Sequence, residues 1–444
     1  QSNLGNYFYR RLRNMKRWGI VFLFLLSGCN SESISPPTVT SQNLASTELT
    51  HGNSDLQGFV AAVKDYDFVS VGERTHQGSK AYSYKARMVK ALHQEGDLTL
   101  VAFEAGLYDG LVAWQNFLTG KQRLQQALIG PNANYMYGHR FSKEVGALAN
   151  YFNEVSQQDN PLLLIGYDAR INSDPGCSVM FDELRSYLQI NSLGLFNYDT
   201  IQTLGPRMMC PWHTTEKFTS QNHQDLTQEL KKLETVLTTQ KRLETVPDYD
   251  PSHPREFRNY ATFWLQIVRS LYSQSYFIIN NIDHSYTDYQ SAENLNWLIN
   301  EWFKIQGQTF IWAHNIHATP IPGSLISAIN SRYPDRSVYS VMQLSYKGLL
   351  AANTPDYTRW LIDTEHLQEE DGTLNSALYH AGYTDAFIDF KSQSESNIDY
   401  LNKPYAIRYA WGYLPTEIPS KIMDGILFVA EEQPAQPISD APLP

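Results

Sequence analysis

The sequence has few cysteines and lacks the short motifs that mark several common enzyme classes. Three cysteines occur in 444 residues, with no Cys-x-x-Cys pair and no zinc-finger spacing. Gly-x-Ser-x-Gly, Gly-x-Gly-x-x-Gly, the Walker A motif and His-Glu-x-x-His are also absent. These absences argue against a serine nucleophile of the α/β-hydrolase type and against a Rossmann or P-loop nucleotide-binding site. They also argue against a zinc site of the zincin type. Any catalysis is therefore expected to use water directly.

Basic residues are scarce as well. Lys and Arg number 35 against 46 Asp and Glu, which gives a formal net charge of −11. Five of the basic residues lie within residues 1–28, which contain no acidic residue, so the remainder is more acidic still. Such a surface lacks the excess positive charge that proteins use to bind DNA or RNA, and it does not favour binding to anionic membrane surfaces.

The apolar run near the N-terminus is too short to cross a bilayer. Residues 20–26 are apolar and follow the basic pair Lys16-Arg17, which is typical of a signal peptide. The sequence Leu26-Ser-Gly-Cys29 resembles the lipobox of bacterial lipoproteins, which implies a lipid on Cys29. Because Asn30 rather than Asp follows, we expect anchoring in the bacterial cell envelope at the outer membrane, facing the periplasm. The alternative is an ordinary signal peptide with a chance cysteine at its end.

Composition divides the rest of the chain. Residues 30–56 are rich in Ser, Thr, Pro and Asn and predict a flexible tether. Residues 57–432 hold the pattern of a folded domain, and residues 433–444 predict a disordered tail. In an oxidising compartment Cys177 and Cys210 either form a disulfide or remain two buried thiols.

Short apolar runs alternate with amphipathic stretches throughout the domain. Runs of this length predict buried parallel strands; they occupy residues 67–71, 98–103, 161–165, 309–312, 337–344, 386–390 and 425–430. The alternation indicates an α/β fold, with a largely parallel central sheet flanked by helices. The stretch from about 214 to 300 is helical and more polar, and predicts a helical insertion. It is either a lid over the rim of the sheet or a plain outer layer.

Four of these strands end in ionisable side chains. Ligands of open parallel sheets sit at the carboxyl ends of the strands, so residues following those ends are expected to share one rim. The residues concerned are Glu73, His76, Glu104, Asp168, His314 and His317. Carboxylates and imidazoles together on a rim suit the activation of water.

Each cluster has a functional and a plainer interpretation. Glu73 can fix the tautomer of His76 and raise its basicity, or His76 can be a strand-end residue satisfied by local hydrogen bonds. His314 and His317 can bind an oxyanion, relay a proton or hold a metal. The nearby Arg74 and Lys85 would repel a cation and instead stabilise a developing alkoxide, so we expect no metal or other cofactor.

The motifs, taken in order, resemble the erythromycin esterase family. They are Val71-Gly-Glu-Arg-Thr-His76, Lys85, Val101-Ala-Phe-Glu104, Gly166-Tyr-Asp168, the stretch from Asp288 to Asn294, Trp312-Ala-His-Asn-Ile-His317 and the closing Asp424-Gly-Ile-Leu-Phe428. The resemblance implies an α/β core under a helical lid, and hydrolysis of a macrolide lactone or related ester by water activated without metal. It implies His76 as general base with Glu73 as its partner. Gln77, Lys80 and Thr287 depart from the family's usual pattern.

The sequence therefore predicts a lipid-anchored hydrolase with a small-molecule ester or lactone as substrate and no nucleic-acid partner. The predicted catalytic residues are His76, Glu73, His314, His317 and Glu104, and the predicted substrate contacts are Arg74, Lys85 and Asp168. Two other hypotheses remain open. One is a metal- or haem-binding lipoprotein, and the other is a non-catalytic surface binding protein on the same fold.

Overall fold

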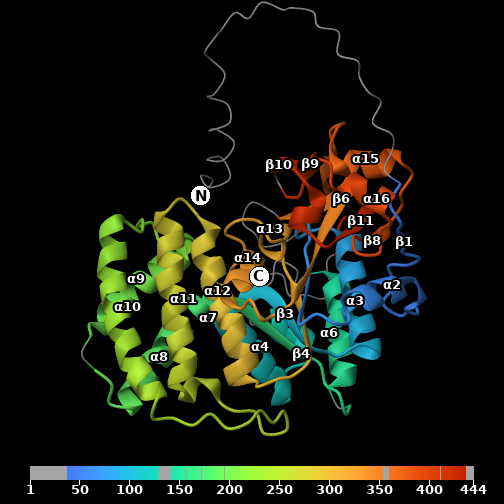
Figure 1. Ribbon diagram of the computed structural model, residues 1–444. Coiled ribbons are helices and arrows are strands. Elements are labelled where there is room, and N and C mark those ends of the chain that lie inside the picture. The colour runs from blue at the N-terminus through green and yellow to red at the C-terminus, as the bar shows by residue number, and fades with distance from the viewer. Residues whose placement is uncertain are drawn as a thin grey trace, which may run out of the picture.

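A nine-stranded sheet runs through the computed structural model (Figure 1). The structure describes residues 38–129, 142–156, 158–171, 173–194, 196–353, 360–410 and 412–436. The predicted signal peptide and Cys29 lie outside these residues, so the lipid anchor stays a prediction. Across the described segments, no helix combines the length and the apolar character that crossing a membrane requires.

The sheet is parallel through its centre. Six neighbouring strands run in one direction, in the order β11, β6, β2, β5, β3, β4, while β1, β8 and β7 pair antiparallel. Their bounds are β1 (Gln42–Asn43), β2 (Phe68–Val71), β3 (Leu98–Gly106), β4 (Leu163–Asp168), β5 (Gln308–Trp312), β6 (Val338–Asn353), β7 (Trp360–Gln368), β8 (Ala386–Asp389) and β11 (Gly425–Glu432). The predicted fold class is confirmed.

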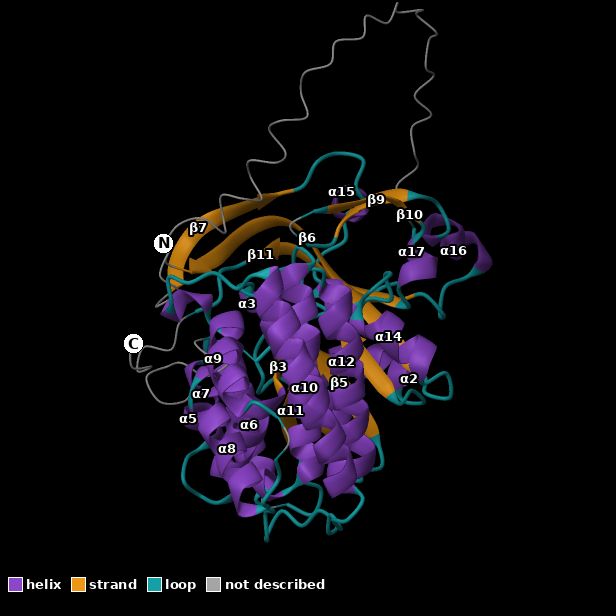
Figure 2. Cartoon of the chain, turned by 90° about the vertical axis from the view of Figure 1, so that its left-hand side faces the viewer, coloured by secondary structure: helices purple, strands orange, loops and turns teal. Residues whose placement is uncertain are grey.

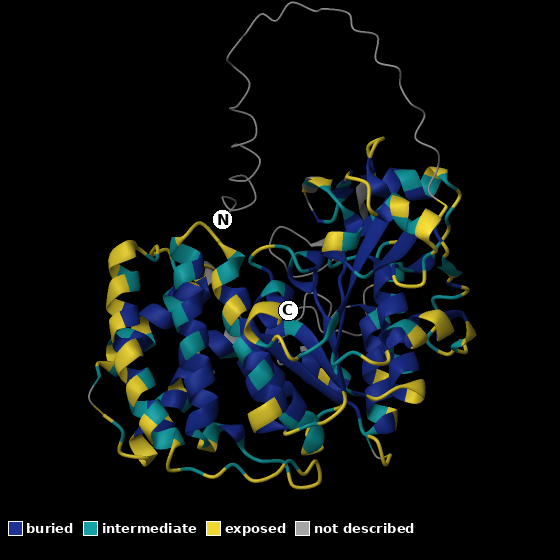
Figure 3. Cartoon of the chain, in the orientation of Figure 1, coloured by how far each residue is buried: buried dark blue, intermediate teal, exposed yellow. Residues whose placement is uncertain are grey.

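Burial explains why the central strands read as continuous apolar runs. Every residue of β2, β4 and β5 is buried, as expected for parallel strands covered on both faces. The dark strands at the centre of Figure 3 show this core between the helices. The helices around it are α2 (Gln57–Val63), α3 (Ser79–Glu95), α4 (Leu107–Leu118), α5 (Leu124–Ile129), α6 (Lys143–Val155), α7 (Asp174–Cys177), α8 (Val179–Ile190), α9 (Tyr198–Met209) and α14 (Leu325–Arg332).

The predicted helical region is built as successive layers beside β4. Helix α12 (His284–Trp297) packs on β4, α11 (Ala261–Ile279) packs on α12, and α10 (Ser220–Lys241) packs on α11 (Figure 2). A five-residue π-helical turn, Leu298–Trp302, then leads toward β5. The region is helical, as expected, and its opening as a lid stays a prediction. The helical region contributes side chains to the rim through the first turns of α12.

A second, smaller core lies on the far end of the sheet. Met342, Ile388, Ile426 and Phe428 are fully buried there and belong to a hydrophobic cluster separate from the main one. The elements that cover it are α15 (Leu374–His380), α16 (Glu395–Leu401), α17 (Pro419–Ile422) and the hairpin of β9 (Tyr405–Arg408) and β10 (Tyr413–Glu417). This unit extends the sheet beyond the strands that carry the predicted site.

Residues 38–56 correct the predicted tether. They lie against the domain, because β1 pairs with the edge strand β8. The Asp55 carboxylate accepts two hydrogen bonds from the buried Arg87 guanidinium, at 2.8 and 2.5 Å. Leu44 also donates its backbone N–H to Asp385 O at 2.9 Å, so backbone pairing and a buried ion pair hold a segment whose polar composition gives no sign of packing.

The predicted tail also begins later than expected. Ser79 donates its backbone N–H to Gln433 O at 2.7 Å, and Ala435 is fully buried. The folded part therefore includes residues 38–56 and 433–436 in addition to the predicted domain. Residues 437–444 lie outside the described part.

Cys177 and Cys210 form a disulfide, which settles the alternative left open by the sequence. Their Cα atoms are 6.2 Å apart, within the range that disulfides span. The bond joins the end of α7 to the residue that follows α9. It therefore ties the loop after β4 to the helical layers.

Candidate active site

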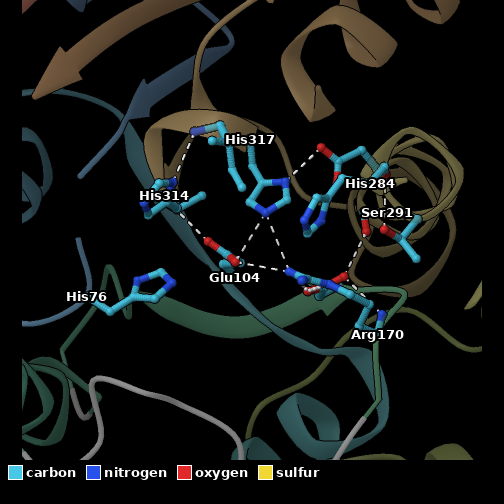
Figure 4. A network of polar contacts seen from close by, with 12 residues as sticks. His76, Glu104, Arg170, His284, Ser291, His314 and His317 are labelled. Atoms are coloured by element: carbon cyan, nitrogen blue, oxygen red, sulfur yellow. Dashed lines mark hydrogen bonds and ion pairs between the residues drawn. The ribbon is translucent and has the colours of Figure 1, made fainter. Parts of the chain in front are cut away.

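The four predicted strand ends converge. Strands β2, β5, β3 and β4 are adjacent and parallel, so their carboxyl ends open on the same rim. Contacts connect the six predicted residues: His76 with Glu73, His76 with His314, His317 with Glu104, and Arg170 with both Glu104 and Asp168. Figure 4 shows His76 and His314 on one side of Glu104, and Arg170 on the other.

The Glu73 carboxylate holds two partners at once. Its Oε1 lies 2.8 Å from His76 Nδ1, and its Oε2 accepts a hydrogen bond from Lys85 Nζ at 2.5 Å. Glu73 is fully buried, whereas a quarter of the His76 side chain is exposed. Because the carboxylate accepts from Nδ1, the neutral ring carries its proton on that atom and presents a lone pair at Nε2.

Close packing between two loops fixes this arrangement. A Cβ on Gly72 would lie 2.0 Å from Asn315 Oδ1, so a larger residue at position 72 would collide with the neighbouring loop. Asn315 also donates its backbone N–H to Glu73 O at 2.8 Å. Its side-chain amide donates to Gln343 O and Tyr409 O, both at 2.7 Å. The loops after β2 and β5 are thereby locked together.

His76 has the electrostatics of a base. Burial by itself lowers the pKa of His76, but the hydrogen bond to Glu73 and the charges of Glu104 and Glu73 outweigh it and raise the pKa above its usual value. The two carboxylates stabilise the imidazolium that forms when His76 takes a proton. The His314 ring lies edge-on, with its centroid 5.2 Å from that of His76.

His314 is held neutral. It precedes α13 (Asn315–Ala318), and its Nδ1 accepts the backbone N–H of Ile316 at 3.2 Å. Burial and the neighbouring His76 lower the pKa of His314 to about 3. A neutral ring that accepts at Nδ1 carries its proton on Nε2. His314 therefore offers an uncharged N–H donor beside His76.

His317 has the opposite character. Its Nδ1 donates to Asp288 Oδ2 at 2.7 Å, and its Nε2 lies 3.4 Å from Glu104 Oε1. Burial lowers the pKa of His317, but the charges of Asp288 and Glu104 more than compensate and raise it to about 9. His317 is therefore an imidazolium at neutral pH.

Glu104 contacts residues on both sides of the rim. The pairing of β3 with β4 shifts register between Phe103 and Gly106, which leaves Glu104 in an irregular part of the strand, as in a β-bulge. Its Oε2 accepts the backbone N–H of His314 at 2.7 Å, and its Oε1 accepts from Arg170 Nη2 at 3.1 Å. Burial raises the pKa of Glu104, but the surrounding histidines and Arg170 hold it well below its usual range.

Asp168 orients Arg170. Its Oδ2 accepts from Arg170 Nε at 3.0 Å and from Nη2 at 2.9 Å, so two N–H groups of the guanidinium share one carboxylate oxygen. Its Oδ1 accepts the Arg170 backbone N–H at 2.9 Å and the Ser291 hydroxyl at 3.3 Å. The guanidinium is thereby aimed at Glu104.

The three predicted substrate contacts are buried and already paired with other side chains in this structure. Lys85 is fully buried against Glu73, with its ammonium 4.5 Å from the centroid of the Trp312 ring. Arg74 is buried in an ion pair with Glu369. Asp168 is 6% exposed and engaged by Arg170. Their charges are paired within the protein, so these side chains support their neighbours in the site, and direct contact with a substrate stays a prediction.

Asp288 lies in the stretch 288–294 that resembles the family, but it was not among the predicted site residues, and neither were His284 and Arg170. His284 and Asp288 are four residues apart on α12 and so share one face of that helix. The His284 ring centroid lies 5.2 Å from that of His317, and burial lowers the pKa of His284 to about 4. The spacing of these two residues was visible, but nothing in the sequence says which neighbour that helix face meets.

Throughout the described segments, no three His, Cys, Asp or Glu side chains are grouped to hold a metal ion.

The raised pKa of His317 predicts a pH-dependent stability. The folded-state pKa of about 9 exceeds the ordinary value of 6.5, so protonated His317 stabilises the fold below pH 6.5, and this contribution is lost as pH rises through about 9. We expect about 3 kcal/mol of unfolding free energy to depend on this group. Urea unfolding at pH 6.5 and 9.5 measures it, with His317→Gln as the reference. Equal pH dependence in the two proteins would contradict the assignment.

Comparisons with known proteins fit this geometry. A family model described as "Erythromycin esterase" matches residues 93–431. The Bacillus subtilis protein named "Putative hydrolase YbfO" is 20% identical over 413 residues, covering 86% of this chain and 87% of its own length.

Two solved structures share the fold. A Bacillus cereus protein of known crystal structure aligns with a TM-score of 0.67 at 18% identity, over 90% of this chain and 97% of its own. A mutant of the erythromycin esterase EreC in its open conformation aligns with a TM-score of 0.59 at 11% identity, over 89% of this chain and 99% of its own. At these identities the alignments show a common fold.

Proposed function

The chain belongs to the erythromycin esterase family, and from that premise we propose that it hydrolyses a carboxylic ester or lactone with water activated by His76. One observation carries the proposal. A partly exposed imidazole is bonded through Nδ1 to a buried carboxylate, and it faces a second imidazole that stays neutral. The names of the relatives support hydrolysis, and the geometry supports a water nucleophile.

The proposed reaction uses the lone pair of His76 Nε2. That atom takes a proton from water while the water oxygen attacks the carbonyl carbon, and the carbonyl electron pair moves to oxygen. The tetrahedral oxyanion then collapses, the carbon–oxygen bond to the alkoxide breaks, and the proton on His76 passes to the alkoxide. The products are an acid and an alcohol, so no reactant besides water is needed.

Each neighbour has a defined part. Glu73 fixes the His76 tautomer and stabilises the imidazolium that forms in the first step. In this proposal the Nε2–H of His314 donates a hydrogen bond to the oxyanion, and the low pKa of His314 keeps its ring from competing for the proton. Glu104 joins the two halves, since it accepts from the His314 backbone and pairs with His317.

Substrate and location extend the proposal. The family name makes a macrolide lactone one candidate substrate, and the Leu-Ser-Gly-Cys29 sequence supports a lipid-anchored enzyme at the periplasmic face of the outer membrane. A panel of macrolides, simple lactones and aryl esters assayed with and without a chelator tests both substrate class and metal independence. Loss of activity on chelation would favour the metal-dependent alternative. No turnover on any ester would favour a non-catalytic binding protein.

The pH dependence of kcat/KM tests the role of Glu73. His76 must be neutral to act as the base. We therefore expect kcat/KM to rise with pH, with the midpoint of the rise above pH 6.5. In Glu73→Gln the hydrogen bond to a charged carboxylate is lost, and the midpoint is expected to move to lower pH. If the midpoint of the kcat/KM profile is the same in Glu73→Gln as in the wild-type protein, Glu73 does not set the pKa of the base.

A further inference from the structure

Tyrosines gather in a surface groove on the helical layers, outside the histidine rim. The groove has a volume of about 590 Å³ and lies among α10, α11, α12 and α14. Its aromatic lining consists of Tyr272, Tyr276, Tyr286 and Tyr289. In the described residues Tyr286 and Tyr289 are the exposed aromatic side chains, at 39% and 41%. Both stand in this groove, so the exposure is concentrated in one place.

Helix α12 separates the groove from the rim. His284 and Asp288 lie on the helix face that meets His317. Tyr286, Tyr289 and Glu293 fall at spacings of three and four residues, which places them on a different face. A ligand in the groove would thus bind on one side of α12 while the proposed chemistry takes place on the other.

The tyrosine rings form an ordered platform. Tyr276 and Tyr286 stack with centroids 5.5 Å apart and an interplanar angle of 24°. Tyr272 lies 5.0 Å from Tyr276, and their hydroxyls are 3.2 Å apart. Rings packed against each other lose little freedom when a ligand binds, because they are already ordered.

The charged groups of the groove balance. Arg269 Nε lies 2.7 Å from Glu234 Oε1, and Arg332 forms an ion pair with Glu293. Arg332 also lies over the Tyr289 ring, 5.2 Å from its centroid. The two cations and two anions of the lining give it no net charge, and the Lys231 ammonium, 5.5 Å from the centroid of the Tyr272 ring, adds one positive charge at the margin. Paired guanidinium and carboxylate groups still offer donors and acceptors in fixed directions.

We propose that this tyrosine groove binds a neutral oligosaccharide. A pyranose ring presents C–H groups on its faces and hydroxyls around its edge. The C–H faces pack on partly exposed tyrosine rings, and the hydroxyls exchange hydrogen bonds with the Arg–Glu pairs and the phenols. The volume lies within the range of small-molecule sites, which suits a short chain of sugar rings. The binding does not depend on the proposed ester hydrolysis.

Isothermal titration with uncharged tetrasaccharides tests the proposal. The probes are cellotetraose, chitotetraose, maltotetraose and mannotetraose, with tetragalacturonate as the anionic comparison. At least one neutral probe is expected to bind. Tyr286→Ala and Tyr289→Ala are each expected to weaken it about tenfold, the effect of losing one stacking ring. Tyr286→Phe keeps the ring and is expected to stay within about threefold of the wild-type affinity.

Two controls separate the groove from the rim and from general surface effects. Leu243→Ala removes an apolar side chain that is 77% exposed at a different place, and is expected to leave affinity unchanged. His76→Ala is also expected to bind normally, since it alters only the rim. Failure of all four neutral probes, or binding of the anionic probe alone, would overturn the proposal. So would a dimer that Tyr286→Ala dissociates, because a second copy would then occupy the groove.

Discussion

The His76→Ala variant is expected to hydrolyse the ester at least about 100-fold more slowly than the wild-type protein, the scale of losing a general base. The carboxylate of Glu73 and the N–H of His314 remain in this variant, but no group at the position of Nε2 takes the proton from water. The fold is expected to survive, because His76 is partly exposed and Glu73 keeps its ion pair with Lys85. Steady-state kinetics on the best ester of the panel gives the ratio.

His253→Ala is a matched control for this measurement. His253 also pairs with a carboxylate three residues before it, Asp250 at 2.8 Å, but its side chain is 84% exposed. The same chemical change at that position is expected to leave kcat/KM unaltered. Added imidazole is expected to restore part of the activity of His76→Ala and none to the control. A wild-type rate in His76→Ala would remove His76 from the role of base.

The half of the site built on strand ends was predictable from the sequence. Each short apolar run is long enough to identify a buried strand, and parallel strands place their carboxyl ends on one rim. Glu73, Glu104 and His314 could therefore be assigned to a common edge without knowing the order of the strands. The order β2, β5, β3, β4 decides only which of them touch.

The half supplied by other elements was not predictable. Asp288 and His284 come from a helix, and a helix can turn any face toward the sheet, so its polar residues do not identify their neighbours. Arg170 follows its strand by two residues and reaches Glu104 only because Asp168 aims it. The packing of residues 38–56 could not be predicted from the sequence for a related reason. A two-residue edge pairing and one buried ion pair leave no periodic pattern in the sequence.

Burial also changed the interpretation of the basic residues. Lys85 lies at a helical position that the sequence places near the rim, and a lysine there suggests contact with substrate. In the structure its ammonium is behind Glu73 and holds the carboxylate that in turn holds His76. The distinction matters because a residue that touches substrate changes affinity, whereas one that holds a buried carboxylate changes the stability of the fold.

Lys85→Met is accordingly expected to lower the free energy of unfolding by about 3–5 kcal/mol, the cost of leaving one member of a buried ion pair without the other. Both side chains of the Lys85–Glu73 pair are fully buried, so water cannot replace the lost partner. Denaturant unfolding measures the change. Lys80→Met, on the same helix, breaks a partly exposed ion pair with Asp385 and is expected to cost about 0–1 kcal/mol.

The double variant Lys85→Met/Glu73→Gln separates stability from function. Removing both charges eliminates the uncompensated carboxylate, so most of the lost stability is expected to return. Activity is expected to remain low, because His76 still lacks the anion that stabilises its protonated form. If Lys85→Met is no more destabilising than Lys80→Met, the ion pair does not hold the site. If the double variant recovers wild-type kcat/KM, His76 does not need a charged partner.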